Sequence, residues 1–267
     1  MKEYMVRPGE AARIDARDPG GAPGFDGGKE RGLKRLEKLT SRLEELQDLL
    51  YADRHHALLV VLQGMDSAGK DGTIRRVFSG VNPEGVRVAS FKVPSQLEAD
   101  HDFLWRAHQQ VPALGEMVLF NRSHYEDVLI TRVHGRISRP VWERRYGEIN
   151  SFERSLSEEG TTILKFFLHL SRGEQKRRLK ERLDDRTKQW KFRESDIEER
   201  RRWPEYMVAY EEALTKTSTR WAPWFVVPSD RRWLRDLIVS QQIVRTLEGF
   251  RMSYPALPRE LRSARVR

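Results

Sequence analysis

A glycine-bracketed loop that ends in lysine follows a short apolar run at residues 58–62. The loop reads GMDSAGK over residues 64–70, which is the spacing of a phosphate-binding loop. Its glycines let backbone N–H groups turn toward phosphate oxygens, the following helix presents its positive N-terminal end, and the lysine contacts the outer phosphates. A turn that merely needs glycine is the structural alternative. We predict phosphate contacts from Gly64, Met65, Ser67, Ala68, Gly69, Lys70, Asp71, Gly72 and Thr73.

The residue after the lysine departs from the usual loop. A Ser or Thr hydroxyl normally binds Mg²⁺ there, whereas this chain has Asp71, and Thr73 lies too far along to be assumed equivalent. Asp66, inside the loop, offers the hard anionic oxygen that divalent cations prefer. We therefore predict that Asp66 serves a bound metal ion.

A second polar cluster follows the apolar segment 116–121. A carboxylate usually orients Mg²⁺ at this place in phosphate-loop enzymes, but this chain has Asn121, and Glu126 would restore the missing negative charge. The planar guanidinium of Arg122 suits a transferring phosphoryl group. Helix capping is the structural alternative, and we expect it of Ser123 in either case. We predict Asp66, Lys70, Arg122 and Glu126 as catalytic residues, and Asp66, Asn121 and Glu126 as metal ligands.

Residues 172–203 alternate basic and acidic side chains. A solvated helix with i, i+4 ion pairs accounts for much of this segment, including residues 200–202. Residues 184–194 are too interrupted for an ordinary helix and place cations around Trp190 and Phe192, which fits a mobile lid whose aromatic residues anchor the closed position. The predicted phosphate contacts in this part are Arg182, Lys188, Lys191 and Arg193.

Composition limits the class of protein. The 267 residues can bury one substantial core, and no segment approaches the roughly 18 apolar residues of a membrane span. The N-terminus has no apolar signal stretch, and the absence of cysteine excludes disulfides. We expect a cytoplasmic protein with no membrane partner.

The chain carries 49 Lys and Arg against 40 Asp and Glu, a net charge of +9. Such a surface favours a polyanion: nucleic acid, acidic lipid or a phosphate-rich small substrate. The phosphate loop favours the third, and because no nucleic-acid-binding motif is recognisable, we expect no nucleic-acid partner.

Apolar patterning predicts an α/β fold. We expect strands at 58–62, 86–91, 116–121, 161–170 and 224–227, separated by helices that include 29–51, 95–108, 138–157 and 231–250. This alternation predicts a five-stranded, mainly parallel sheet covered on both faces, with the loops after the first and third strands converging. Residues 1–28 read as an arm, packed on the surface or loosely ordered, and residues 29–267 as one domain with a lid at about 183–202. The helix 29–51 would pack within one subunit or between two.

With these pieces assembled, the chain closely resembles the family-2 polyphosphate kinases from about residue 29 onward. The motifs that carry the resemblance are GMDSAGKDGTIRRVFSGVNPEGVRVASF, DFLWRAHQQVP, FNRSHYEDVL, TTILKFFLHLS and RLDDRTKQWKFR. The resemblance implies a three-layer α/β/α phosphate-loop kinase fold of the thymidylate-kinase type with a helical lid. It also implies a homo-oligomer, either a dimer or a tetramer.

The same resemblance implies Mg²⁺-dependent phosphoryl transfer, with Mn²⁺ as a substitute, between inorganic polyphosphate and a nucleotide. Many relatives carry Asp where this chain has Asn121. The combination of Asn121 with Glu126 resembles the subgroup that converts AMP to ADP and ADP to ATP, and guanine nucleotides are further candidates. Two alternatives stay open: an ATP-dependent nucleoside monophosphate kinase on the same fold, and a nucleic-acid-binding module that would bind with steep salt dependence.

Overall fold

A single parallel sheet forms the centre of the computed structural model, which describes residues 1–261. The strand order is β2-β3-β1-β4-β5, and every neighbouring pair is parallel. The predicted sheet and all five predicted strands are confirmed. β1 is buried along its whole length because strands flank it on both sides and helices cover both faces. The strands are β1 (Ala57–Gln63), β2 (Val86–Ser90), β3 (Met117–Asn121), β4 (Thr161–His169) and β5 (Trp224–Pro228).

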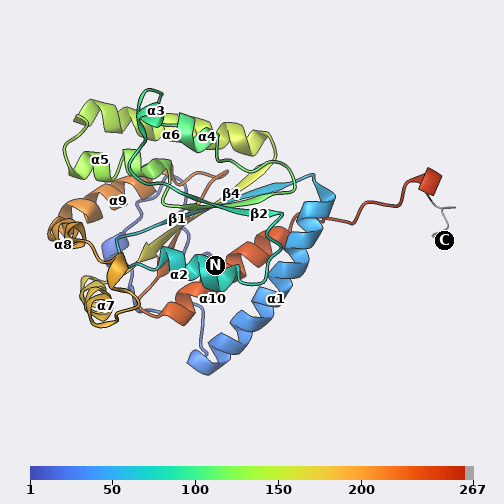
Figure 1. The fold of residues 1–267 in the computed structure, drawn as a ribbon, viewed down its shortest axis with the longest axis horizontal. Helices are drawn as coiled ribbons and strands as arrows, with labels where there is room; N and C mark the ends of the chain where they lie inside the picture. Colours follow the sequence, from blue (N-terminus) through green and yellow to red (C-terminus); the bar gives the residue numbers. More distant parts are fainter. Residues whose placement is uncertain (262–267) are drawn as a thin grey trace.

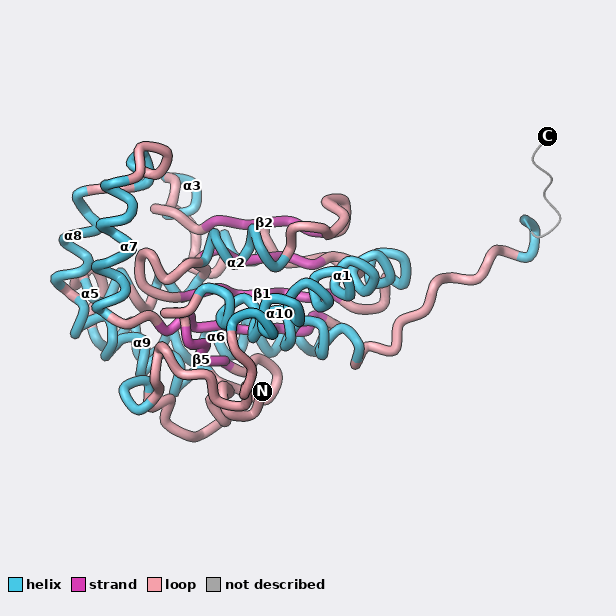
Figure 2. Tube along the Cα trace, turned by 90° about the horizontal axis from the view of Figure 1, so that it is seen from below, coloured by secondary structure: helices cyan, strands magenta, loops and turns pink. Residues whose placement is uncertain are grey.

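Helices form a layer on each face of the sheet (Figures 1 and 2). One core joins the sheet to α1, α2 and α10, and the other joins it to α6 and α9. The helices are α1 (Lys29–Asp53), α2 (Lys70–Val77), α3 (Gln96–Ala99), α4 (Trp105–His108), α5 (Ile130–Val133), α6 (Arg139–Glu158), α7 (Arg172–Asp184), α8 (Glu194–Arg201), α9 (Trp203–Thr217) and α10 (Arg232–Glu248), with short 3₁₀ turns η2 (His124–Asp127) and η3 (Gln189–Lys191). Within residues 1–261, every helix is too short or too polar to cross a bilayer.

The apolar face of α1 packs against α10 of the same chain. Leu43 and Leu50 of α1 are buried in one core with Leu234 and Ile238 of α10. The two helices approach closely at Gly32, where an added Cβ would lie 2.3 Å from the Trp233 ring. The helix 29–51 was expected to pack either within one subunit or between two. The structure shows packing within the subunit, against α10.

The predicted continuous helix over 95–108 is wrong. Ser95 and Glu98 do form the expected capping box, but α3 ends after one turn and α4 begins only at Trp105. Between them the Asp102 carboxylate accepts a hydrogen bond from the Leu104 backbone N–H at 2.9 Å. This side-chain contact competes with helical hydrogen bonding, as short Asp side chains commonly do.

The N-terminal arm packs along the outer edge of the sheet. The backbone N–H of Val6 donates to Trp224 O at 2.9 Å, and that of Val226 donates to Tyr4 O at 2.8 Å. Tyr4, Val6 and Ile14 are buried. Residues 1–28 thus add a short antiparallel contact to β5 and cover that edge. Residues 262–267, which we included in the predicted domain, lie outside the described residues.

A fully buried ionic network ties β4 to α6 and η2. The Lys165 ammonium donates to Glu153 Oε2 at 2.5 Å and to the Tyr125 hydroxyl at 2.8 Å, and His124 Nε2 lies 3.3 Å from Glu153 Oε1. Burial lowers the pKa of Lys165 to about 8. Burial alone would raise the pKa of Glu153, but the charge of Lys165 and the hydrogen bond with His124 hold it below its usual value. The network fixes the segment that directly follows Arg122.

Replacing one member of this network should be costly. We expect Glu153→Gln to lower the free energy of unfolding by about 3–5 kcal/mol, because it leaves a buried ammonium without its counter-charge. Urea denaturation of the purified protein measures this change. The control is Glu158→Gln on the same helix, whose exposed pair with Arg154 contributes about 1 kcal/mol or less. Equal effects of the two substitutions would contradict the assignment.

Candidate active site

The phosphate loop lies between β1 and α2 and has an unusual backbone. Gly64, Ser67 and Gly69 all have positive φ, at 151°, 67° and 110°. At Gly64 a Cβ would lie 2.8 Å from the Leu168 carbonyl oxygen, so a side chain has no room there. α2 begins at Lys70, and its N-terminal end therefore faces the loop, as the spacing predicted.

Lys70 is buried beside the loop it follows. Its ammonium donates to Gly64 O at 2.7 Å and to Met65 O at 3.4 Å. Burial lowers its pKa to about 8, and the nearby Arg122 lowers it further, while the carboxylates of Asp66, Glu126 and Asp71 oppose that shift. The ammonium thus lies against the first two carbonyl groups of the loop, and charges of both signs surround it.

Arg122 joins the two predicted clusters. Its guanidinium contacts Asp66 Oδ1 at 2.7 Å and Glu126 Oε2 at 3.6 Å. The carboxylate of Glu126, together with Asp66, raises the pKa of Arg122 against the effect of burial. Burial raises the pKa of Glu126, although Arg122 and Lys70 attract its negative form. The expected convergence of the loops after β1 and β3 is therefore confirmed.

The two remaining polar groups of the cluster contact each other. Asn121 Nδ2 donates to Asp71 Oδ1 at 2.7 Å, so the carboxylate after the lysine lies against the end of β3. No group of three or more His, Asp or Glu side chains in residues 1–261 is arranged to hold a metal ion by itself. The oxygens of Asp66 and Glu126 nevertheless have the chemistry that Mg²⁺ uses when it binds through one or two carboxylates and substrate phosphates.

Three side chains hold the outer side of the loop. Gln175 Nε2 donates to Asp66 O at 2.9 Å. Arg178 Nη1 donates to Ser67 O at 3.0 Å and to Ala68 O at 3.2 Å. Arg235 Nη1 also donates to Ala68 O, at 3.3 Å. Donors on α7 and α10 thus bind the carbonyls of three successive loop residues, Asp66, Ser67 and Ala68, and hold the loop backbone on that side.

The hydroxyl of Thr73 is used elsewhere. It donates to Asp236 Oδ1 at 3.1 Å, and Asp236 also accepts from Arg235 Nε at 2.8 Å. Thr73, one of the predicted phosphate-binding residues, thus faces α10. Its hydroxyl anchors α2 to that helix.

The predicted lid consists of the end of α7, the 3₁₀ turn η3 and α8. Arg182 lies 3.5 Å from Asp196, Lys188 is paired with Asp185 at 2.5 Å, and the backbone N–H of Arg193 donates to Asp196. The Lys191 ammonium lies 5.0 Å from the centre of the Trp190 ring. Trp190 itself is 76% exposed in this arrangement, and its role in anchoring a closed position stays a prediction.

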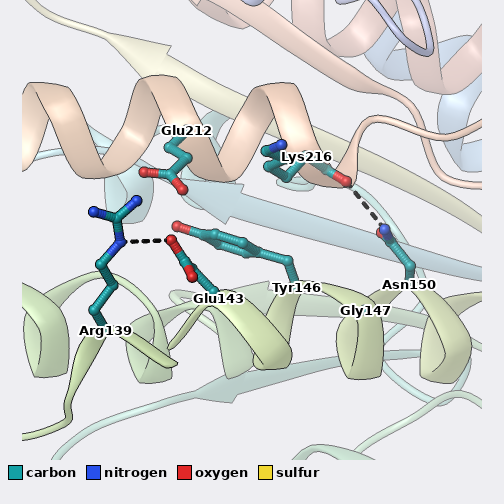
Figure 3. A pocket seen from close by; sticks show the side chains of 7 residues that line it. All are labelled: Arg139, Glu143, Tyr146, Gly147, Asn150, Glu212 and Lys216. Atoms are coloured by element: carbon teal, nitrogen blue, oxygen red, sulfur yellow. Dashed lines mark hydrogen bonds and ion pairs between the residues drawn. The ribbon is translucent and has the colours of Figure 1, made fainter. Parts of the chain in front are cut away.

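A cavity of about 480 Å³ lies away from the loop, between α6 and α9 (Figure 3). Arg139 is paired there with Glu143, and Asn150 donates to the Lys216 carbonyl oxygen. None of the predicted site residues lines it. The lining residues are Arg139, Glu143, Tyr146, Gly147, Asn150, Glu212 and Lys216.

Comparison with known proteins decides the family. The family model described as Polyphosphate kinase 2 (PPK2) matches residues 27–254. The chain belongs to the polyphosphate kinase 2 family. It is 56% identical to the AMP/ADP-polyphosphate phosphotransferase of Meiothermus ruber over 96% of both chains. It is 45% identical to the ADP-polyphosphate phosphotransferase of Rhodopseudomonas palustris over 96% of this chain and 93% of that one.

A solved structure confirms the fold. The crystal structure of polyphosphate kinase 2 from Arthrobacter aurescens matches with a TM-score of 0.93 and 43% identity, covering 96% of this chain and 91% of the other. The predicted phosphate-loop kinase fold and the family resemblance are both confirmed.

Sequence reasoning missed the residues of this polyphosphate kinase 2 that support the loop from outside. Gln175 and Arg178 lie in α7, whose charge pattern is typical of a solvent-exposed helix. Arg235 lies in α10, 166 positions beyond Gly69. Arg200, assigned to a solvated face, in fact donates to Gln175 Oε1 at 2.9 Å. The only local signal was an arginine among the apolar residues of α10.

The backbone conformation of Gly69 disfavours any side chain at this position. Its φ is +110°, and a Cβ there would lie 1.8 Å from Arg235 Nη1. We expect Gly69→Ala to lower the free energy of unfolding by at least about 1–2 kcal/mol, from left-handed strain alone. The control is Gly72→Ala inside α2, where the nearest atom would be 3.4 Å away and helix propensity favours alanine. Thermal or urea unfolding compares them, and a Gly69→Ala protein as stable as Gly72→Ala would contradict the expected backbone strain at Gly69.

Proposed function

We propose that this polyphosphate kinase 2 transfers phosphoryl groups reversibly between inorganic polyphosphate and nucleoside mono- and diphosphates, converting AMP to ADP and ADP to ATP. The observation that carries the proposal is the 56% identity, over 96% of both chains, to a protein named AMP/ADP-polyphosphate phosphotransferase. Guanine nucleotides are further acceptors in this proposal. We also propose that the enzyme is cytoplasmic and works as a homo-oligomer.

The residues around the loop divide the work of binding. In the proposal, the backbone of residues 64–73 and Lys70 bind one phosphate group, and the guanidinium of Arg122 binds the group in transfer. Arg122 suits this task because it presents planar paired donors and keeps its charge at any relevant pH. The cations of the predicted lid, Arg182, Lys188, Lys191 and Arg193, would contact the rest of the chain of phosphates.

The chemical step requires no strong general base. A terminal phosphate oxygen of the acceptor, already ionised at neutral pH, attacks the terminal phosphorus of polyphosphate. The new P–O bond forms as the anhydride P–O bond breaks, and the shortened polyphosphate leaves with the electron pair on its new terminal oxygen. Positioning and charge stabilisation therefore supply most of the catalysis. Lys70 and Arg122 stabilise the charge that develops on the transferred group.

The acidic side chains fit a divalent metal ion. Asp66 and Glu126 offer carboxylate oxygens beside Lys70, and Asn121 offers an amide oxygen at the end of β3. These residues would hold Mg²⁺, or Mn²⁺ in its place, and the bound ion would neutralise phosphate charge. Both carboxylates also contact Arg122, so the same two groups would orient the arginine and the ion.

Turnover without ATP tests this function. We expect purified protein with AMP, polyphosphate and Mg²⁺ to produce ADP and then ATP, observed by phosphorus NMR. Lys70→Ala should lower the rate about 10²- to 10³-fold through lost charge stabilisation, whereas Lys176→Ala on the exposed face of α7 should leave it unchanged. Phosphorylation of AMP by ATP alone, with polyphosphate unused, would instead support the nucleoside monophosphate kinase.

Glu126 should determine how the enzyme uses its metal ion. Because Asn121 stands where many relatives have a carboxylate, we expect Glu126→Gln to require several-fold more Mg²⁺ for half-maximal rate and to lose AMP phosphorylation more than ADP phosphorylation. Magnesium titrations with each acceptor measure both effects. Glu148→Gln, on the surface of α6, serves as the control. An unchanged magnesium requirement together with an unchanged acceptor ratio would show that Glu126 does not compensate for Asn121.

A further inference from the structure

The side chain of Gln175 lies between the phosphate loop and α8, and only 1% of the residue is exposed. Its amide nitrogen donates to Asp66 O at 2.9 Å. Its amide oxygen accepts from Arg200 Nη1 at 2.9 Å. This arginine nitrogen also donates to Arg172 O at 2.8 Å. One buried amide therefore connects a backbone carbonyl of the loop to a guanidinium on α8.

The chemistry of this connection is specific to an amide. The loop presents an acceptor and α8 presents a donor, so the linking group needs a donor at one end and an acceptor at the other. Glutamate could still accept from Arg200 but could not donate to Asp66 O. An apolar side chain of similar size could do neither. The two hydrogen bonds, to Asp66 O and from Arg200, therefore require glutamine at position 175. Packing alone would accept an apolar side chain of similar size.

The carbonyl that Gln175 holds belongs to a residue of the reaction site. The carboxylate of Asp66 contacts Arg122 at 2.7 Å, so Asp66 is held through its backbone on one side and its side chain on the other. Arg178, three positions along the same helix, binds the next two carbonyls of the loop. α7 is therefore attached to three successive loop residues, and Gln175 is the member of this set that also contacts α8.

From this arrangement we infer that Gln175 is a positioning residue that couples the placement of α8, within the predicted lid, to the conformation of the phosphate loop. Arg200 is its partner on the lid side. When α8 is seated, Arg200 orients the Gln175 amide, and the amide in turn holds Asp66 in the place where its carboxylate meets Arg122. The effect on turnover rests on the proposed phosphoryl transfer, whereas the coupling itself depends only on the contacts described.

Amide hydrogen exchange tests the coupling without any substrate. We expect Arg200→Ala, a change in α8, to speed the exchange of residues 64–69 by about fivefold or more, because local opening of the loop becomes easier. Arg201→Ala is the matched control, since it removes the same charge from the exposed neighbouring position. If Arg200→Ala leaves the loop as protected as Arg201→Ala does, the inference is wrong, whatever the enzyme's activity.

Kinetics test whether the coupling serves the reaction. We expect Gln175→Leu and Gln175→Glu both to lower kcat by roughly 5- to 100-fold, with smaller changes in KM, because a buried carbonyl loses its donor in each case. The glutamate variant retains the contact with Arg200, so full activity there would overturn the inference. Circular dichroism and the melting temperature confirm that the variants are folded.

A double variant tests whether Gln175 and Arg200 affect turnover through the same connection or independently. If Gln175 and Arg200 act through the same connection, Gln175→Leu combined with Arg200→Ala falls no further in kcat than Gln175→Leu alone. Multiplication of the two single effects would overturn the coupling. A wild-type protein without polyphosphate-dependent turnover would refute the proposed function and leave the exchange experiment to decide the coupling.

Discussion

The site depends on the direction of a few backbone carbonyl groups. A loop that binds phosphate with its N–H groups must point its carbonyl groups the other way, where they need donors of their own. For the carbonyls of Asp66, Ser67 and Ala68, the donors come from α7 and α10. Arg178 and Arg235 are both nearly buried, and Glu174 and Asp236 pair with them at 2.7 Å. The loop conformation is thereby held by neutralised arginines behind it, whose cost of burial is offset by these carboxylates.

The front of the loop follows a different electrostatic rule. Lys70 and Arg122 are surrounded by Asp66, Asp71 and Glu126, which oppose the lowering of the pKa of Lys70. The cations therefore already have partners within the protein, and a phosphate must share them or replace a carboxylate. In the proposed reaction a divalent ion would resolve this competition, since it attracts phosphate and carboxylate oxygens together. Such an ion would account for the negative charge around the proposed phosphate site.

The sequence predicted what is encoded locally. Two glycines and a lysine at fixed spacing predicted the loop. A polar cluster directly after an apolar strand predicted that Arg122 and Glu126 lie beside it, as they do. The sheet followed from apolar runs alternating with helical periodicity. The errors arose where a single side chain overrides the pattern: Asp102 binds a backbone N–H and interrupts a helix that composition favours. The contacts of Gln175 and Arg235 with the loop were not predicted, because their loop partners lie more than 100 positions away in the chain. The charge pattern of a helix does not indicate such distant contacts.

The N-terminal arm has a consequence for association between molecules. By pairing with Trp224 and Val226 it occupies the free backbone groups at one border of the sheet. Within residues 1–261, β2 forms the opposite border and keeps Val88 46% exposed. The arm thereby leaves fewer unpaired backbone groups on the β5 side, which protects that border against edge-to-edge pairing with another chain.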